Sequence, residues 1–237
     1  MKYAAILAGG TGKRMSSALP KQFLELKGEA IIIRTIRRIL SSNLFDKLII
    51  AIHPEWKSYL EELIAKAALP AENILITEGG KERLDSIRNT TGFITSTFGE
   101  AGEEDYIVIF DAVRPFVSHK IMQDSLEALS RHEAVVAALP AVDTMLWIEE
   151  GTRVDSMPQR SKLFHGQAPD SFRLGTLCQA LAALTPEEEQ IITGTAQICM
   201  LKGIDIHTIP GDPQNIKVTT PFDIQLGEVL CQQEDPQ

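Results

Sequence analysis

The sequence predicts an α/β fold of the Rossmann-like type, with a mostly parallel sheet, helices on both of its faces and an inserted β-arm. Short apolar runs alternate with stretches of helical periodicity, a pattern typical of parallel strands joined by helices. The runs at residues 47–52 and 106–110 are apolar nearly throughout, as expected for strands covered on both faces of a sheet. The alternation stops between residues 141 and 170, which indicates an insertion.

Strands and helices alternate regularly through the first 140 residues. Each predicted strand is a short apolar run, and each predicted helix repeats its apolar side chains at helical spacing. Proline marks two boundaries, because Pro70 ends a helical pattern and Pro140 ends a strand. The predicted strands are residues 3–7, 47–52, 73–77, 106–110 and 134–139, and the predicted helices are residues 31–40, 55–68, 83–98 and 119–131.

Residues 141–172 contain no long helical pattern. Strand-like pieces at residues 144–149 and 153–156 flank a Glu-Gly pair, which predicts a hairpin-like arm. Beyond the arm, helices are predicted from Leu174, over residues 186–201 and from Pro221, with a strand at residues 204–209. Because no repeat, low-complexity segment or linker interrupts the chain, we expect one domain over residues 1–237, with the arm at about residues 141–170.

The composition is that of an ordinary globular protein, with 44% hydrophobic and 23% charged residues. The net charge of −9 disfavours a general nucleic-acid or membrane-surface binder, because nothing offsets repulsion by phosphates at long range. Three widely spaced cysteines favour free thiols in a reducing compartment over a disulfide or zinc site. The initial apolar stretch is too short for a signal-peptide core and no window is long enough for a membrane span, so we expect a cytoplasmic protein.

A glycine-rich and basic loop, LAGGTGKRMSSALPKQF at residues 7–23, follows the first predicted strand. It does not fit a P-loop, because Arg14 stands where a Ser or Thr is needed, nor a dinucleotide fingerprint, because Met15 replaces the third glycine. A plain turn would explain one or two glycines, but not three beside several cations. Glycines let backbone N–H groups approach a triphosphate or a base, and Arg14 and Lys21 supply charge for the phosphates and the transition state. The loop therefore predicts a nucleotide site at the carboxyl end of the first strand.

A carboxylate, Asp111, comes directly after the strand predicted at residues 106–110. At such a strand end it is a natural ligand for Mg²⁺, which would in turn bridge phosphate oxygens of a nucleotide. The alternative is a helix cap or a turn residue. Arg114 follows three residues later, and from the residues alone it is an ion-pair partner of Asp111.

Six segments resemble, in order along nearly the whole chain, the sugar-phosphate nucleotidyltransferases, especially the cytidylyltransferases that act on methylerythritol phosphate and ribitol 5-phosphate. They are LAGGTGKRM with LPKQF, GGKERLDSI (79–87), FDAVRPF (110–116), VDTM (142–145), PQRSKLFHGQAPDSF (158–172) and NIKVTTPFD (215–223). The resemblance implies that a polyol-phosphate oxygen attacks the α-phosphorus of CTP in line, with Mg²⁺ as the cofactor. A phosphate monoester is already a competent nucleophile, so positioning and charge neutralisation suffice and no general base is required.

The resemblance also implies roles for individual residues and a homodimer, in which the arm offers Thr144 and Arg160 to the neighbour's substrate phosphate. From the residues alone, the second glycine segment could be a turn before a helix, Lys217 a surface lysine, and the arm residues merely exposed. Asp223 we expect to cap the last helix. The implied catalytic residues are Arg14, Lys21 and Lys217; the nucleotide-binding residues are Leu7, Ala8, Gly9, Gly10, Thr11, Gly12, Gly80, Arg83, Ser86 and Asp111, the last also the metal ligand; the substrate-binding residues are Arg114, Thr144 and Arg160.

Two departures from the family pattern concern the acceptor. The family's Gln-Thr-Pro-Gln is here Gln167-Ala168-Pro169-Asp170, and Gly194-Thr195 stands where family members commonly carry an Asp. We expect both departures to lie on the acceptor side of the site. The segments HGQAP, LPKQF and FDAVRPF look more like the ribitol-phosphate enzymes of teichoic-acid and capsule synthesis, so the sequence favours D-ribitol 5-phosphate over 2-C-methyl-D-erythritol 4-phosphate, the acceptor of isoprenoid synthesis.

Two other classes of protein fit the sequence less well. A glycosyltransferase of similar architecture would need a DxD-type metal motif, which FDAVRP is not. A non-catalytic nucleotide-binding homologue would be expected to lose Arg14, Lys21, Asp111 or Lys217 first, and all four are present. We therefore expect an enzyme.

Overall fold

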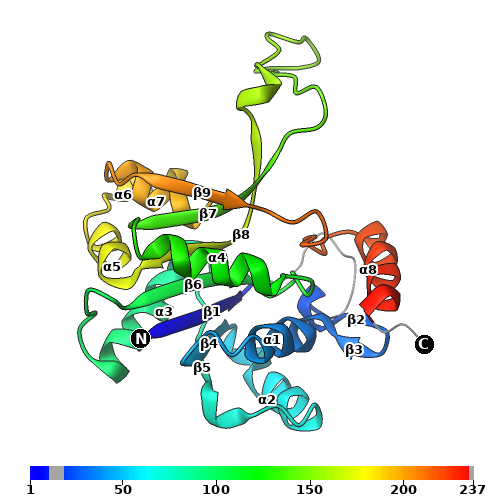
Figure 1. Cartoon of the computed structure of the whole chain (residues 1–237), viewed down its shortest axis with the longest axis vertical. Coiled ribbons are helices and arrows are strands. Elements are labelled where there is room, and N and C mark those ends of the chain that lie inside the picture. Colours follow the sequence, from blue (N-terminus) through cyan, green and yellow to red (C-terminus); the bar gives the residue numbers. More distant parts are fainter. Residues whose placement is uncertain (11–18, 235–237) are drawn as a thin grey trace.

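A single seven-stranded sheet forms the centre of the computed structural model, which describes residues 1–10 and 19–234 (Figure 1). The strand order is β5-β4-β1-β6-β8-β7-β9, and β8 runs antiparallel to both of its neighbours while the other described pairs are parallel. The mostly parallel sheet predicted from the sequence is therefore confirmed. The strands are β1 (Lys2–Ala8), β4 (Lys47–Ile52), β5 (Ile74–Glu78), β6 (Tyr106–Asp111), β7 (Ala134–Pro140), β8 (Phe164–Arg173) and β9 (Ile206–Pro210), with a separate antiparallel pair, β2 (Glu25–Leu26) and β3 (Glu29–Ala30).

Helices cover both faces of the sheet because successive strand residues point to opposite sides. On β1, Ile6 packs into the cluster under α1, α2 and α4, whereas Ala5 packs into the cluster under α3, α5 and α7. A third apolar cluster joins β2 and α1 to α8. The helices are α1 (Ile31–Ser41), α2 (Lys57–Lys66), α3 (Arg83–Phe98), α4 (His119–Leu129), α5 (Leu174–Ala182), α6 (Pro186–Ile191), α7 (Thr195–Leu201) and α8 (Pro221–Glu234), with 3-10 turns η1 (Lys21–Phe23), η2 (Pro54–Trp56), η3 (Ala71–Asn73) and η4 (Arg160–Lys162).

The strand β8 is the main difference from the predicted elements. Residues 164–170 were expected in the arm, but they are part of a central strand between β6 and β7. Pairing with β7 passes from Val136–Asp170 directly to Ala137–Gln167, so Ala168 and Pro169 form a bulge on β8 and no ladder hydrogen bond is needed from the proline. Gly166 and Pro169 interrupt the apolar pattern of this strand, so the sequence does not predict it.

The helix predicted over residues 186–201 is also wrong as a single element, because it is divided into α6 and α7. A capping box of Thr185 and Glu188 opens α6, and the backbone becomes extended at Ile192 and again at Gly194. Gly194 is the N-cap of α7, which starts the second helix in a new direction and buries Thr195 completely.

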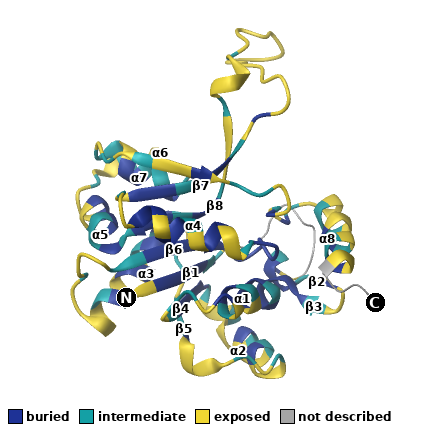
Figure 2. Ribbon diagram, viewed as in Figure 1, coloured by how far each residue is buried: buried dark blue, intermediate teal, exposed yellow. Residues whose placement is uncertain are grey.

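The segment between β7 and β8 projects away from the sheet as a long excursion (Figure 1). It contains one isolated bridge, between Trp147 and Ser156, in place of a regular hairpin. Figure 2 shows that most of it is exposed, and its large apolar side chains, among them Trp147 and Met157, face solvent. In the described part of the chain, none of the helices is both long and apolar enough to cross a membrane.

Candidate active site

A cleft opens at the carboxyl ends of β1 and β6, the edge at which open α/β sheets bind ligands. The structure brings together in it the first glycine loop, the start of α3, the end of β6 and the segment after β9. Its lining residues are Leu7, Ala8, Gly9, Gly10, Lys21, Gln22, Gly80, Lys81, Glu82, Arg83, Ser86, Asp111, Ala112, Val113 and Lys217. Thr11, Gly12 and Arg14, which the sequence predicts to belong to this site, lie outside the described residues.

The two glycine segments meet directly at the cleft. A Cβ built on Gly9 would lie 3.2 Å from the Ser86 hydroxyl and 3.3 Å from the Gly80 carbonyl oxygen, so the two segments pack against each other with little room for a side chain. The Gly80 N–H donates to the Ser86 hydroxyl at 3.0 Å, and that hydroxyl donates to the Glu82 carbonyl at 3.2 Å. A capping box of Glu82 and Asp85 then begins α3. The second glycine segment is thus both a turn before a helix and a wall of the cleft.

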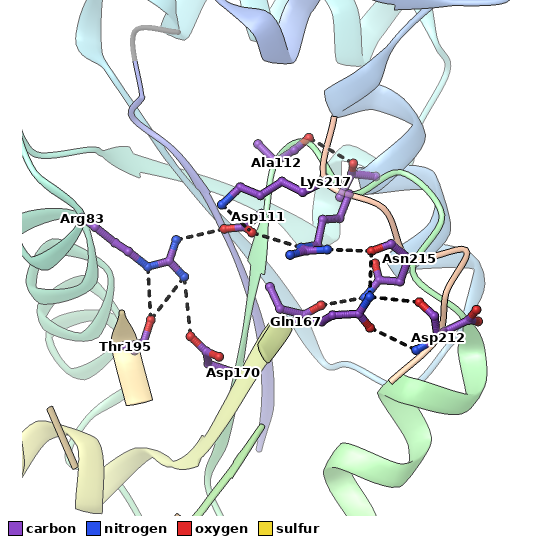
Figure 3. Close-up of polar contacts among 12 residues, drawn as sticks. Arg83, Asp111, Ala112, Gln167, Asp170, Thr195, Asp212, Asn215 and Lys217 are labelled. Carbon is purple, nitrogen blue, oxygen red and sulfur yellow. Dashed lines mark hydrogen bonds and ion pairs between the residues drawn. The ribbon is translucent and has the colours of Figure 1, made fainter. Parts of the chain in front are cut away.

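Asp111 is the electrostatic centre of the cleft (Figure 3). Its Oδ1 lies 2.9 Å from Arg83 Nη1, and its Oδ2 lies 3.1 Å from both Arg114 Nε and Lys217 Nζ. Burial alone would raise the pKa of this carboxyl, but the three cations outweigh burial and hold the pKa well below its usual range. Three cations around one ionised carboxylate leave an excess of positive charge, which suits a polyphosphate ligand.

The segment after β9 holds Arg114 and Lys217 in place. Arg114 Nη1 donates to the Asn215 carbonyl at 2.6 Å, and the Asn215 side chain donates to the Ala168 carbonyl at 2.8 Å. Gln167 exchanges two hydrogen bonds with the backbone of Asp212, each 3.0 Å long. Asn215 and Gln167 were not singled out from the sequence, although both lie in segments that carry the resemblance.

Arg83 has two further neighbours besides Asp111 (Figure 3). Its Nη2 lies 3.6 Å from Asp170 Oδ2, and Nε and Nη2 lie 3.4 and 3.3 Å from the Thr195 hydroxyl. The two departures that we expected on the acceptor side therefore contact a residue of the nucleotide side. For Asp170 the physical reason is the position of β8, which is paired with β6 and brings Asp170 beside Arg83.

The remaining predicted residues lie elsewhere. Thr144 and Arg160 are exposed on the arm, and the Arg160 guanidinium donates to the Val142 carbonyl at 3.0 Å. Neither lines the cleft of its own chain. Asp223 caps α8 as expected, because its carboxylate accepts from the backbone N–H groups of Thr219 and Thr220, each at 2.8 Å.

The cleft fits a hard divalent cation that is held chiefly by a ligand. Within the described ranges, no group of three or more His, Cys, Asp or Glu side chains could hold a metal ion. Both Asp111 oxygens are paired with cations, Oδ1 with Arg83 and Oδ2 with Arg114 and Lys217, so Mg²⁺ would replace one of these contacts as the cations turn to the phosphates. Mg²⁺ commonly takes one or two carboxylates together with substrate phosphates and waters. The donor set is thus suitable for Mg²⁺ once a polyphosphate is present.

A family model and two solved structures that match this chain describe the same kind of protein. The family model described as IspD, 2-C-methyl-D-erythritol 4-phosphate cytidylyltransferase, matches residues 3–233. The 2-C-methyl-D-erythritol 4-phosphate cytidylyltransferase of Francisella tularensis superposes with a TM-score of 0.80 at 26% identity, covering 96% of this chain and 98% of that one. The 4-diphosphocytidyl-2C-methyl-D-erythritol synthase of Anaerococcus prevotii has the same fold, with a TM-score of 0.79 at 21% identity and 98% of each chain covered.

Proposed function

Because this chain belongs to the 2-C-methyl-D-erythritol 4-phosphate cytidylyltransferase family and is therefore a nucleotidyltransferase, we propose that it transfers CMP from CTP to 2-C-methyl-D-erythritol 4-phosphate. The observation that carries this proposal is the family match over nearly the whole chain, together with the cation-rich cleft around Asp111. The sequence favoured D-ribitol 5-phosphate and hence teichoic-acid or capsule synthesis. The comparisons do not support that acceptor and favour the methylerythritol phosphate, which belongs to isoprenoid synthesis.

The cleft residues supply charge and position for the transfer. A phosphate oxygen of the acceptor forms a bond to the α-phosphorus of CTP, and the bond from that phosphorus to the bridging oxygen of the β-phosphate breaks to release pyrophosphate. The Lys217 side chain is paired with Asp111 but 42% exposed, so it can turn toward the phosphates of a bound nucleotide. Lys21, at the start of η1, lines the same cleft, and Arg14 of the loop is proposed to join it. These cations stabilise the negative charge of the transition state.

Mg²⁺ is proposed as the cofactor, with Asp111 as its protein ligand. When bound, it would neutralise phosphate charge and orient the triphosphate. Arg114 is held between Asp111 and the Asn215 carbonyl, and we propose that it contacts the acceptor phosphate. Glycines 9 and 10 and the Gly80–Ser86 segment would contact the nucleotide by close backbone approach.

Dimerisation through the arm completes the proposal. The exposed apolar side chains of the arm, including Trp147 and Met157, suit an interface between two copies of the chain. Arg160 and Thr144 would then reach the neighbour's site. Mixing Arg160→Ala with Asp111→Asn tests this, because a hybrid dimer contains one site with both native residues and random pairing restores about a quarter of wild-type activity. No recovery on mixing would refute the shared site.

The proposed reaction is tested by pyrophosphate release with CTP, Mg²⁺ and each acceptor. Rapid release with 2-C-methyl-D-erythritol 4-phosphate, abolished by Lys217→Met, is expected. Release with ribitol 5-phosphate alone would refute the proposed acceptor and leave the cytidylyl transfer intact.

A further inference from the structure

Arg83 is surrounded by groups from three different elements besides its own helix. Asp111 comes from the end of β6, Asp170 from the middle of β8, and Thr195 from the first turn of α7 (Figure 3). The Arg83 side chain is 31% exposed, and the residue also lines the cleft. Each guanidinium nitrogen therefore has a protein partner, while the side chain stays partly exposed to the cleft.

The sheet register explains why Asp170 reaches this position. Asp170 stands opposite Ile109 on β6, and Ile109 and Asp111 lie on the same face of that strand because they are two residues apart. Two carboxylates thus emerge on the same side of the sheet from neighbouring strands. Arg83 lies between them, 2.9 Å from an Asp111 oxygen and 3.6 Å from an Asp170 oxygen.

Asp170 lies where burial disfavours an ionised carboxylate, and a strand residue with only a structural role would not need to carry one. Its side chain is 17% exposed, and burial raises the pKa of its carboxyl, although Arg83 and a hydrogen bond with Thr195 act in the opposite direction. Thr195 is completely buried, and its hydroxyl faces both Arg83 and Asp170. A buried carboxylate and a buried hydroxyl directed at one arginine indicate a positioning role.

We propose that Asp170 and Thr195 are positioning residues that fix the Arg83 guanidinium for CTP binding. The inference rests on the proposed function in taking CTP as the nucleotide. Arg83 has five N–H donors, and Nε, one Nη1 donor and one Nη2 donor are directed at Thr195 and Asp111. Nη2 also lies 3.6 Å from Asp170 Oδ2, and the partly exposed side chain lines the cleft. Without Asp170, the guanidinium would be drawn toward Asp111 alone and would lose this orientation.

The test measures CTP binding by isothermal titration calorimetry with the full-length protein, so no acceptor is needed. Asp170→Asn is expected to raise the Kd for CTP by about 10- to 100-fold, the usual effect of removing a group that orients a binding residue. In turnover assays the KM for CTP should rise while the KM for the acceptor stays within about twofold. Asp124→Asn, which removes a half-buried carboxylate paired with the exposed Lys120, is the matched control and should change neither value.

A second substitution provides rescue. Thr195→Asp added to Asp170→Asn moves the carboxylate to the Thr195 position, which also contacts Nη2 of the same guanidinium and lies at the start of a helix where a negative charge is favourable, and should restore most of the CTP affinity. Should Asp170→Asn not fold, Thr195→Val compared with Thr195→Ser gives the same answer, because only the valine lacks the hydroxyl.

Four results would decide between these roles. Weakened CTP binding with rescue supports the proposal, whereas unchanged CTP binding, or an increase in the acceptor KM alone, overturns it and returns Asp170 to the acceptor side. Absence of turnover with either acceptor, combined with weakened and rescued CTP binding, would refute the proposed function while leaving the role of Asp170 intact.

Discussion

Replacing Asp111 by Asn tests whether this carboxylate holds the cations of the cleft together. The substitution keeps the size of the side chain and removes its charge. Arg83, Arg114 and Lys217 all lie within 3.1 Å of the carboxylate in the wild-type protein. We expect the variant to be less stable because it leaves buried positive charge without its partner.

The expected loss of unfolding free energy depends on how deeply each of the three cations is buried. The Lys217 side chain is 42% exposed and can be solvated by water, and Arg83 retains its ion pair with Asp170. Neither residue therefore contributes much to the loss of stability. Arg114 is 11% exposed in its side chain and loses a buried partner, a change that costs about 3–5 kcal/mol. We take about 3 kcal/mol because Arg114 keeps its bond to the Asn215 carbonyl. For a chain of this length, that corresponds to a fall in Tm of about 6–12 °C.

The assay is urea unfolding of both proteins with a chelator present, so that bound metal does not contribute. Asp124→Asn is the control and should lose less than about 0.5 kcal/mol. The cations hold the pKa of Asp111 below its usual range, so the wild-type advantage is complete above about pH 4 and shrinks as the pH falls below it. An Asp111→Asn variant as stable as wild type, or more stable, would show that desolvation outweighs the attraction and would refute this reasoning.

Three further predictions concern the loops, the chemistry and a buried thiol. Gly80→Ala, in the turn before α3, would place a Cβ 2.0 Å from the Asp85 Cβ and should weaken CTP binding at least tenfold. Gly92→Ala, within α3, has nothing within 4 Å and should stabilise the fold by about 0.5–1 kcal/mol. Calorimetry and urea unfolding measure both, and equal CTP affinity in the two variants would contradict the prediction. Lys217→Met should lower kcat by about 10²- to 10³-fold with little change in Tm, and an unchanged kcat in the pyrophosphate assay would exclude a catalytic role. Burial raises the pKa of Cys199 to about 12, so iodoacetamide at pH 8 should label this thiol only after unfolding. Mass spectrometry measures the labelling, and rapid labelling of Cys199 in the native protein would contradict the prediction.

Local sequence patterns account for most of the fold. The run KLIIAI became β4 over Lys47–Ile52, and the helical pattern at residues 83–98 became α3 with the same bounds. The strand β8 could not be predicted in this way, because FHGQAPDSFR contains breaker residues and no continuous apolar run. Its position in the sheet depends on pairing with β6 and β7, which are distant in sequence.

The site was predictable where it depends on strand ends and was not where it depends on strand order. Gly9 and Asp111 were identified from their own segments and Lys217 from the family resemblance, and the fold brings all three to one cleft. Asp170 was expected beside the acceptor because the sequence does not show that β8 lies against β6. Its contact with Arg83 follows from that single antiparallel pairing.

The central claim is cytidylyl transfer to 2-C-methyl-D-erythritol 4-phosphate, and direct competition tests it most sharply. The full-length protein is given equal concentrations of 2-C-methyl-D-erythritol 4-phosphate and D-ribitol 5-phosphate with limiting CTP and Mg²⁺, and the CDP-alcohols are quantified by mass spectrometry. Because both acceptors share one enzyme population and one CTP pool, the product ratio equals the ratio of their kcat/KM values. We expect 4-diphosphocytidyl-2C-methyl-D-erythritol as the dominant product; an excess of CDP-ribitol would contradict the proposed acceptor.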